Sequence, residues 1–288
     1  KQELIHQYSE YKFFDSHKAK VISPGVDHEK FHHVHSTTET SDISNMMNPF
    51  LVDSSKPPLL AISRAVKRKN VPSLVEAFGR SEKLKKNCNL VLVLGSRENI
   101  SKLDLQQKEV FQEIFEMIDK YNLYGKVAYP KRHLPDQIPA IYRWAASRGG
   151  LFVNPALTEP FGLTLLEASS CGLPMVATDD GGPREIKSKC ENGLLTNVTD
   201  LNSLKNVLEK AVSNKSQWKL WSRNGIEAVT RHFSWDNHVR NYLLNVYQQN
   251  QELMMLSSSG IKLSCLNGRS SLINPHSSKT SGSEWMIN

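Results

Sequence analysis

Two carboxylates, Glu159 and Glu167, stand eight residues apart in a segment that also contains Phe161-Gly162. This segment follows a short apolar run and predicts a loop that opens a helix over residues 162–171. Glycine lets a ligand approach the backbone closely, and a helix N-terminus offers free N–H groups that suit a phosphate. The segment therefore has the residue types of an anion-binding loop.

The two carboxylates can serve different parts of one ligand. Glu159 lies ahead of the helix N-terminus and can accept hydrogen bonds from sugar hydroxyls. Glu167 lies about one and a half turns into the helix and can reach a second group, such as a ribose. For Glu159 taken alone, a surface glutamate before an ordinary capped helix is the better interpretation.

A second group of polar residues follows the first predicted core strand. Arg64, Lys67, Arg68 and Lys69 place four basic residues in six positions. Arginine offers a planar fork and lysine a point charge, so together they can neutralise a diphosphate. A solvated basic loop is the alternative, and charge alone favours it.

Two further loops follow predicted strands. Tyr129 to His133, with Lys131 and Arg132, lies where backbone groups can contact a base, although an ordinary solvent loop fits equally well. Gly181-Gly182-Pro183 predicts a tight turn into a helix. There too, a plain strand-to-helix connection stays open.

The elements that must position these residues are short continuous apolar runs alternating with helical patterns. Such runs are typical of parallel strands covered on both faces, which predicts an α/β, doubly wound, Rossmann-like sheet. Ligands of such sheets bind at the carboxyl ends of the strands, where all four loops lie. We predict strands at 59–63, 90–95, 127–129, 150–154, 174–178 and 193–195, and helices at 71–78, 106–121, 135–147, 162–171, 200–213, 215–230 and 235–250.

The two ends of the chain differ from the middle in composition and in predicted local structure. Residues 1–13 predict a short amphipathic helix, and residues 20–25 a short strand. Residues 31–57, rich in His, Ser, Thr and Asn, predict a linker or inserted loop. Residues 251–288 form a polar tail that we expect to be disordered. The start lacks Met and a signal-peptide pattern, so we expect the chain to begin within a larger product.

Composition excludes several classes of protein. The net charge of +7 is spread without interleaved aromatic residues, which argues against nucleic-acid binding. No apolar run approaches the roughly 18–20 residues that span a membrane. The four cysteines form no CxxC pair, which argues against a zinc site or a disulfide framework and fits the cytoplasm. The cluster His28, His32, His33 and His35 fits no metal-ligand template, and we expect no metal.

Taken together, these segments resemble the retaining GT-B glycosyltransferases and, within them, the sucrose-phosphate synthases. The likeness runs from about residue 1 to residue 247. Its most specific part is Phe152 to Leu157 running into Glu159 to Thr164. The family's usual Pro-Asp-Pro spacer is here Ala65-Val66-Lys67, which keeps the Arg-to-Lys spacing of the family.

The resemblance implies a role for each matching residue. Arg64 and Lys69 would stabilise the departing diphosphate without a metal cofactor. Glu159 would bind hexose hydroxyls and Glu167 the ribose. The remaining donor-binding positions are the backbone at Phe161, Gly162, Leu163 and Thr164, facing the phosphate and the sugar, and Lys131 and Arg132, beside the uracil.

The reaction implied is the transfer of glucose from UDP-glucose to fructose 6-phosphate with retention, giving sucrose 6-phosphate and UDP. Residues 58–250 would be the donor-binding domain, and residues 1–30 the end of an acceptor-side domain. Transfer would then require the other half. A truncated, non-catalytic nucleotide-sugar-binding module and a related hexosyltransferase with another donor or acceptor both stay open.

Overall fold

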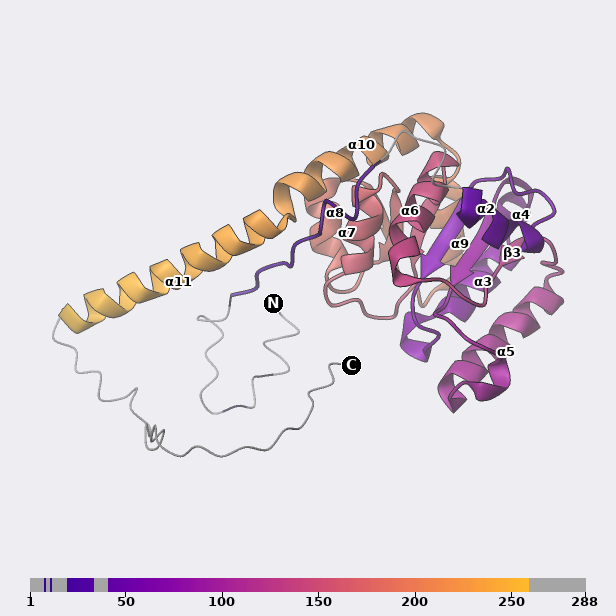
Figure 1. Ribbon diagram of the computed structural model, residues 1–288, viewed down its shortest axis with the longest axis horizontal. Helices are drawn as coiled ribbons and strands as arrows, with labels where there is room; N and C mark the ends of the chain where they lie inside the picture. The colour runs from indigo at the N-terminus through magenta and orange to yellow at the C-terminus, as the bar shows by residue number, and fades with distance from the viewer. Residues whose placement is uncertain (1–7, 9–10, 12–19, 34–40, 259–288) are drawn as a thin grey trace. The chain divides into compact units, whose positions relative to one another are not determined.

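Within residues 8, 11, 20–33 and 41–258, which the computed structural model describes, six parallel strands form one sheet in the order β3-β2-β1-β4-β5-β6 (Figure 1). Their side chains are almost entirely buried, as continuous apolar runs require. This confirms the predicted doubly wound sheet. The strands are β1 Pro58–Ile62, β2 Asn89–Val93, β3 Val127–Ala128, β4 Leu151–Asn154, β5 Met175–Thr178 and β6 Gly193–Thr196.

The strand order reverses at β1, which pairs with β2 on one side and with β4 on the other. The register on the β4 side places Leu59 opposite Leu151. In an open parallel sheet the crevice at such a reversal is where ligands bind. The loops that follow β1 and β4 therefore flank the expected site.

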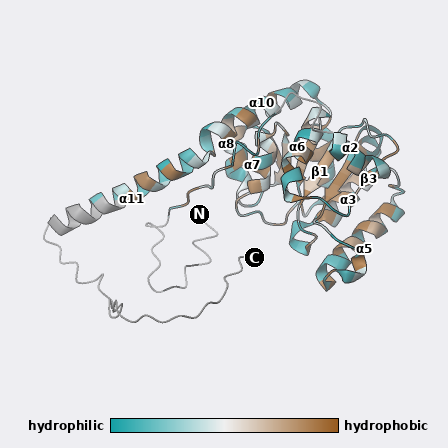
Figure 2. Ribbon diagram, viewed as in Figure 1, coloured by the Kyte–Doolittle hydropathy of each residue, from teal (hydrophilic) through white to brown (hydrophobic). Residues whose placement is uncertain are grey.

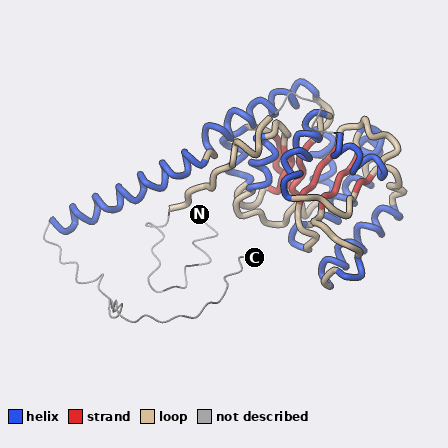
Figure 3. Tube along the Cα trace, viewed as in Figure 1, coloured by secondary structure: helices blue, strands red, loops and turns tan. Residues whose placement is uncertain are grey.

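Helices cover both faces of the sheet (Figure 3). Successive residues of β1 point to opposite faces: Leu60 belongs to one buried apolar cluster, and Leu59 and Ala61 belong to the other. Figure 2 shows the apolar residues along β1 in brown. One face packs α3 Val71–Gly79, α5 Leu105–Lys120 and α9 Leu201–Ala211; the other packs α6 Ile138–Ser147, α7 Leu163–Ser170, α8 Pro183–Cys190 and much of α10 Lys215–His232.

Part of the segment predicted as a linker, residues 31–57, packs onto the domain. Residues Ser41–Met47 form helix α2 and Asn48–Phe50 a 3-10 turn, η2. Ile43 and Met47 are fully buried in the same cluster as α6. Two apolar residues at one-turn spacing are enough to anchor so short a helix, but too few to show a period in the sequence.

The strand predicted at residues 20–25 does not form. Residues 20–25 belong to none of the strands in the described part of the chain. The isolated bridge that follows them joins Val26 to Ser234, with the Val26 N–H donating to Phe233 O at 2.7 Å. A strand needs a neighbouring backbone along its length, and the core sheet lies elsewhere. A further helix that the sequence does not predict, α4 Glu82–Asn87, is capped by the Ser81 hydroxyl.

The last described helix, α11 Trp235–Ser258, extends past the predicted end at 250, so the expected tail begins with helical residues. Its added residues are mostly good helix formers. The chain divides into two compact units, residues 1–242 and 243–288. Most of the helix predicted at 1–13, and the tail from 259 onward, lie outside the described residues. None of the described helices has the length and apolar character needed to cross a membrane.

Candidate functional site

The loop after β1 carries the predicted basic cluster. Lys67–Lys69 form a short 3-10 turn, η3, which ends at Asn70 in a left-handed conformation (φ 53°) before α3 begins. The Leu157 N–H donates to Arg68 O at 2.9 Å, which ties this loop to the one after β4. The Lys69 side chain is held inward and is only 17% exposed, whereas Arg64 is exposed.

Lys69 and Glu159 meet at the reversal in strand order. Lys69 Nζ lies 2.6 Å from Glu159 Oε2, and both side chains are largely buried. The side-chain amide of Asn154, the last residue of β4, donates to the same oxygen at 3.1 Å and accepts from the Ala156 N–H. The structure thus joins two of the predicted residues and adds Asn154, which the sequence pattern does not single out.

The surroundings of Glu159 favour its ionised form. Burial raises its pKa, but hydrogen bonds from Lys69, Asn154 and the Gly162 N–H, together with the charge of Lys69, outweigh that effect. The pKa of Glu159 therefore lies below its ordinary value. At neutral pH this carboxylate is an anion that can accept hydroxyl donors.

Gly181 and Gly182 allow the backbone at Glu159 and Phe161 to pack closely. A Cβ on Gly181, whose φ is +83°, would lie 2.3 Å from Glu159 O, and one on Gly182 would lie 2.5 Å from Phe161 O. The Gly182 N–H donates to Glu159 O at 2.8 Å. These glycines do more than join a strand to a helix, because they fix the backbone that carries Glu159.

The N-terminus of α7 lies directly after this backbone. Gly162, in a left-handed conformation (φ 80°), precedes Leu163, the first residue of the helix, and no side chain caps this end. Phe161 and Leu163 are 54% and 43% exposed. The first N–H groups of a helix have no partner within it. The Gly162 N–H donates to the Glu159 carboxylate, whereas the backbone at Leu163 and Thr164 can present donors to a phosphate.

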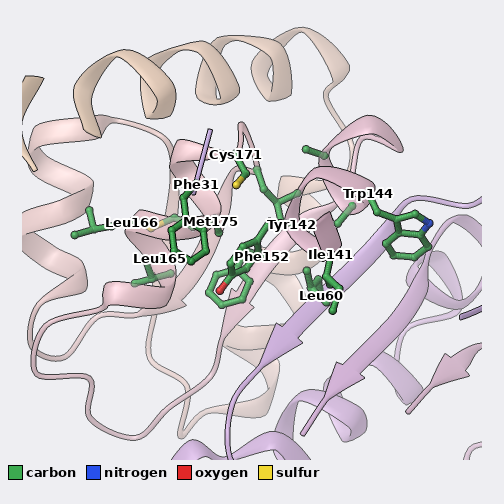
Figure 4. Close-up of a cluster of buried hydrophobic side chains, with 14 of the residues drawn as sticks. Phe31, Leu60, Ile141, Tyr142, Trp144, Phe152, Leu165, Leu166, Cys171 and Met175 are labelled. Carbon is green, nitrogen blue, oxygen red and sulfur yellow. The ribbon is translucent and has the colours of Figure 1, made fainter. Parts of the chain in front are cut away.

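Glu167 lies further along α7 in a different environment. The buried Tyr142 hydroxyl, on α6, donates to Glu167 Oε2 at 3.3 Å. Tyr142 itself packs edge-on against Phe152 in the apolar cluster shown in Figure 4. Burial raises the pKa of Glu167 to about 7, against the opposing effects of the Tyr142 hydrogen bond and the charge of Lys30. Glu167 therefore changes its charge near neutral pH.

The loop after β3 exposes Lys131 and Arg132. Its backbone is fastened to the end of β2, because the Arg97 guanidinium donates to Tyr129 O at 3.0 Å and to Pro130 O at 3.1 Å. Nothing in the sequence distinguishes Arg97, which follows a strand as one basic residue among many.

Three histidines of the cluster, His28, His32 and His33, lie within the described residues, and His35 lies outside them. Across residues 20–33 and 41–258, together with 8 and 11, no group of three or more His, Cys, Asp or Glu side chains could hold a metal ion. Two members of the cluster contact other groups: His28 Nδ1 lies 3.2 Å from Ser170 Oγ, and His33 Nδ1 lies 3.4 Å from Cys171 O.

Known proteins have sequences similar to this one. Residues 42–228 match the family described as Glycosyl transferases group 1. Sucrose-phosphate synthase 4 of Arabidopsis thaliana is 41% identical over 244 residues, which cover 78% of this chain and 23% of that protein. The sucrose-phosphate synthase of Zea mays is 44% identical over 197 residues, covering 68% and 18%. The chain thus spans about a fifth of the length of these relatives.

Solved structures share the fold. The sucrose-phosphate synthase of Thermosynechococcus elongatus superposes with a TM-score of 0.64 at 24% identity, covering 90% of this chain and 57% of that one. HepE of Anabaena, in complex with UDP and glucose, superposes with a TM-score of 0.65 at 20% identity, covering 80% and 57%. The fold is that of one half of a GT-B glycosyltransferase.

Proposed function

Because this chain belongs to the group 1 family of glycosyl transferases, we propose that its site binds UDP-glucose as a glucosyl donor. The observation that carries this proposal is the Lys69–Glu159 pair at the reversal in strand order, 2.6 Å between Nζ and Oε2. It holds a cation for a diphosphate and an anion for sugar hydroxyls at adjacent positions. HepE, of similar fold, was solved with UDP and glucose.

Each residue has a proposed task in donor binding. Lys69 turns from Glu159 to the diphosphate, with Arg64 as the second cation, so that no metal is needed to neutralise the leaving group. Glu159, released from Lys69 but still bonded to Asn154, accepts hydrogen bonds from hydroxyls of the hexose. The helix N-terminus receives the phosphate, Glu167 binds the ribose hydroxyls, and Lys131 and Arg132 lie beside the uracil.

The reaction proposed for the domain, together with an acceptor-binding half, is that of its relatives, which are sucrose-phosphate synthases. The bond from glucose C1 to the diphosphate oxygen breaks, and C1 bonds to a hydroxyl oxygen of fructose 6-phosphate on the same face. The products are UDP, sucrose 6-phosphate and the hydroxyl proton. We place the protein in the cytoplasm, where free thiols such as those of Cys88, Cys171 and Cys190 persist.

Isothermal calorimetry with UDP and UDP-glucose tests donor binding. We expect both to bind the folded chain, more tightly than ADP-glucose or GDP-mannose, and we expect Glu159→Gln to weaken UDP-glucose more than UDP, because UDP lacks the hexose. A folded sample that binds neither nucleotide would contradict the proposal. Equal affinity for UDP-glucose, ADP-glucose and GDP-mannose would support a site for nucleotide sugars but contradict its assignment to uracil and glucose.

Turnover is measured separately. Formation of sucrose 6-phosphate from UDP-glucose and fructose 6-phosphate is expected only when an acceptor-binding half is supplied. Formation of product under those conditions would rule out the alternative that the chain is a module that only binds nucleotide sugars. A donor-binding chain that makes no product in either condition would favour that module.

A further inference from the structure

Arg97 is a buried cation next to the proposed donor site. It follows β2 at the carboxyl edge of the sheet and is only 8% exposed. Its guanidinium lies 4.4 Å from the centre of the Phe111 ring and donates to the carbonyls of Tyr129 and Pro130. Burying a charged group is costly unless it is well hydrogen-bonded. The hydrogen bonds of the guanidinium that offset this cost go to one loop, the one after β3.

The same loop has more links to the end of β2. The Arg97 N–H donates to Lys131 O at 2.8 Å. The Ser96 hydroxyl donates to His133 O at 2.9 Å and accepts from the His133 N–H at 3.2 Å. The backbone groups that bond to Ser96 and Arg97 all belong to residues 129–133, which we call the β3 loop. Residues 96–97 therefore fasten the β3 loop to the end of β2.

The β3 loop needs such a fastening because the strand before it is short. β3 pairs with β2 only through Leu90–Val127 and Val91–Ala128. Beyond Ala128 the described backbone has left the ladder, and its position depends on other contacts. The planar fork of arginine can bond two successive carbonyls at once, which a lysine ammonium on its flexible stem cannot do with fixed geometry.

We propose that Arg97 is a positioning residue for nucleobase recognition, because it fixes the β3 loop in the shape that Lys131, Arg132 and the loop backbone use to read uracil. This inference rests on the proposed donor function. Arg97 acts through the β3 loop and does not itself touch the base. A rigid loop rejects a wrong base because polar groups would then be left unpaired.

Arg148 supplies a matched control. Its guanidinium stacks 4.7 Å from the Trp144 ring and donates to Trp144 O at 3.5 Å and to Ser44 Oγ at 3.1 Å. Burial lowers the pKa of both arginines. Arg148, however, precedes β4 and so lies at the amino edge of the sheet, opposite the donor site. Replacing either arginine removes similar contacts, but only Arg97 holds the β3 loop.

The test measures base selectivity, the ratio of UDP to GDP affinity by calorimetry, in Arg97→Lys and Arg148→Lys. A ratio is independent of the fraction of folded protein, so general destabilisation does not move it. We expect Arg97→Lys to lower UDP affinity roughly tenfold, as for loss of a charged hydrogen bond, and to shrink the ratio by a similar factor. Arg148→Lys should keep the wild-type ratio. Amide exchange in residues 129–133 should rise in Arg97→Lys without nucleotide.

A wild-type ratio in a folded Arg97→Lys protein overturns the inference and leaves donor binding intact. A folded wild-type chain that binds no UDP overturns the proposed function, and the inference with it. If Arg97→Lys does not fold, Ser96→Ala takes its place, because it removes the exposed hydroxyl that bonds both backbone groups of His133. A reduced ratio in Ser96→Ala supports the fastening role, and an unchanged ratio overturns it.

Discussion

The two ends of the segment from Glu159 to Glu167 differ in electrostatic environment. At the loop end, Glu159 faces the Lys69 ammonium and two further donors, and its pKa lies below the ordinary value. At the helix end, Glu167 faces the Tyr142 hydroxyl across a buried contact, and burial raises its pKa to about 7. The same side chain is thus a fixed anion in one place and a titrating group in the other.

This difference shows that neighbours, rather than the spacing of the two glutamates, decide the charge of each. Glu159 can accept hydrogen bonds from hydroxyls at any pH near neutral. Glu167 accepts two ribose hydroxyls well only when ionised, so donor affinity should rise with pH through about 7. Three variants test this contrast.

The largest expected effect is on stability, in Glu167→Gln. The ordinary pKa of 4.5 rises to about 7 in the folded protein, so between these values the folded state binds more protons than the unfolded chain. The free energy of unfolding should therefore fall as pH rises from about 4.5 to about 7, by on the order of 3 kcal/mol. Urea unfolding at pH 5 and pH 8 should show this fall in the wild type and lose it in Glu167→Gln.

The exposed Glu227 provides the control for that variant. Glu227→Gln should keep the wild-type dependence on pH. An unchanged dependence in Glu167→Gln would show that Glu167 is not the titrating group.

The second effect is on affinity, in Lys69→Met. Loss of the ammonium removes a charge-assisted contact with the diphosphate, which is worth about 1.5–3 kcal/mol, so UDP should bind roughly 10–100-fold more weakly. The pKa of Glu159 should rise, because burial then acts without its main counterpart. Lys67→Met is the matched control: Lys67 lies in the same turn, is 60% exposed and pairs with Glu109. Similar losses in both variants would mean that net charge, rather than the pair, binds the diphosphate.

The smallest effect is expected in Tyr142→Phe. The hydroxyl contact is long, at 3.3 Å, and its loss removes a donor that lowers the pKa of Glu167. The pKa should rise further above its usual value, and the midpoint of the pH dependence of UDP affinity should move to higher pH by less than about one unit. A midpoint that moves to lower pH would contradict the assigned role of the hydroxyl.

The strands could be predicted because short continuous apolar runs bounded by turn residues are typical of buried parallel strands. That pattern also placed Lys69 and Glu159 in loops that follow strands. Their contact spans 90 positions, which no local pattern contains. Asn154 left a weak signal, as a polar residue closing an apolar strand. Tyr142 left none, since a tyrosine on an apolar helix face has the pattern of a core residue.

Other predictions depended on partners that a sequence does not show. Residues 20–25 have the composition of a strand but no neighbouring backbone to form one. Helix α2 shows the reverse case, because a polar segment is held by the buried side chains of Ile43 and Met47 and by hydrogen bonds from Trp144 and Arg148 to Ser44 Oγ. In each case tertiary packing, rather than local propensity, decided the outcome.

We propose above all that Glu159 and Glu167 bind the same nucleotide-sugar molecule. Titration of their carboxyl groups by carbon NMR tests this claim most directly. Without ligand, Glu159 should titrate below its ordinary range and Glu167 near 7. Saturating UDP should lower the pKa of Glu167, because ribose hydroxyls donate to its ionised form, and UDP-glucose should perturb Glu159 as well. Bound UDP that leaves the titration of Glu167 unchanged would contradict this claim.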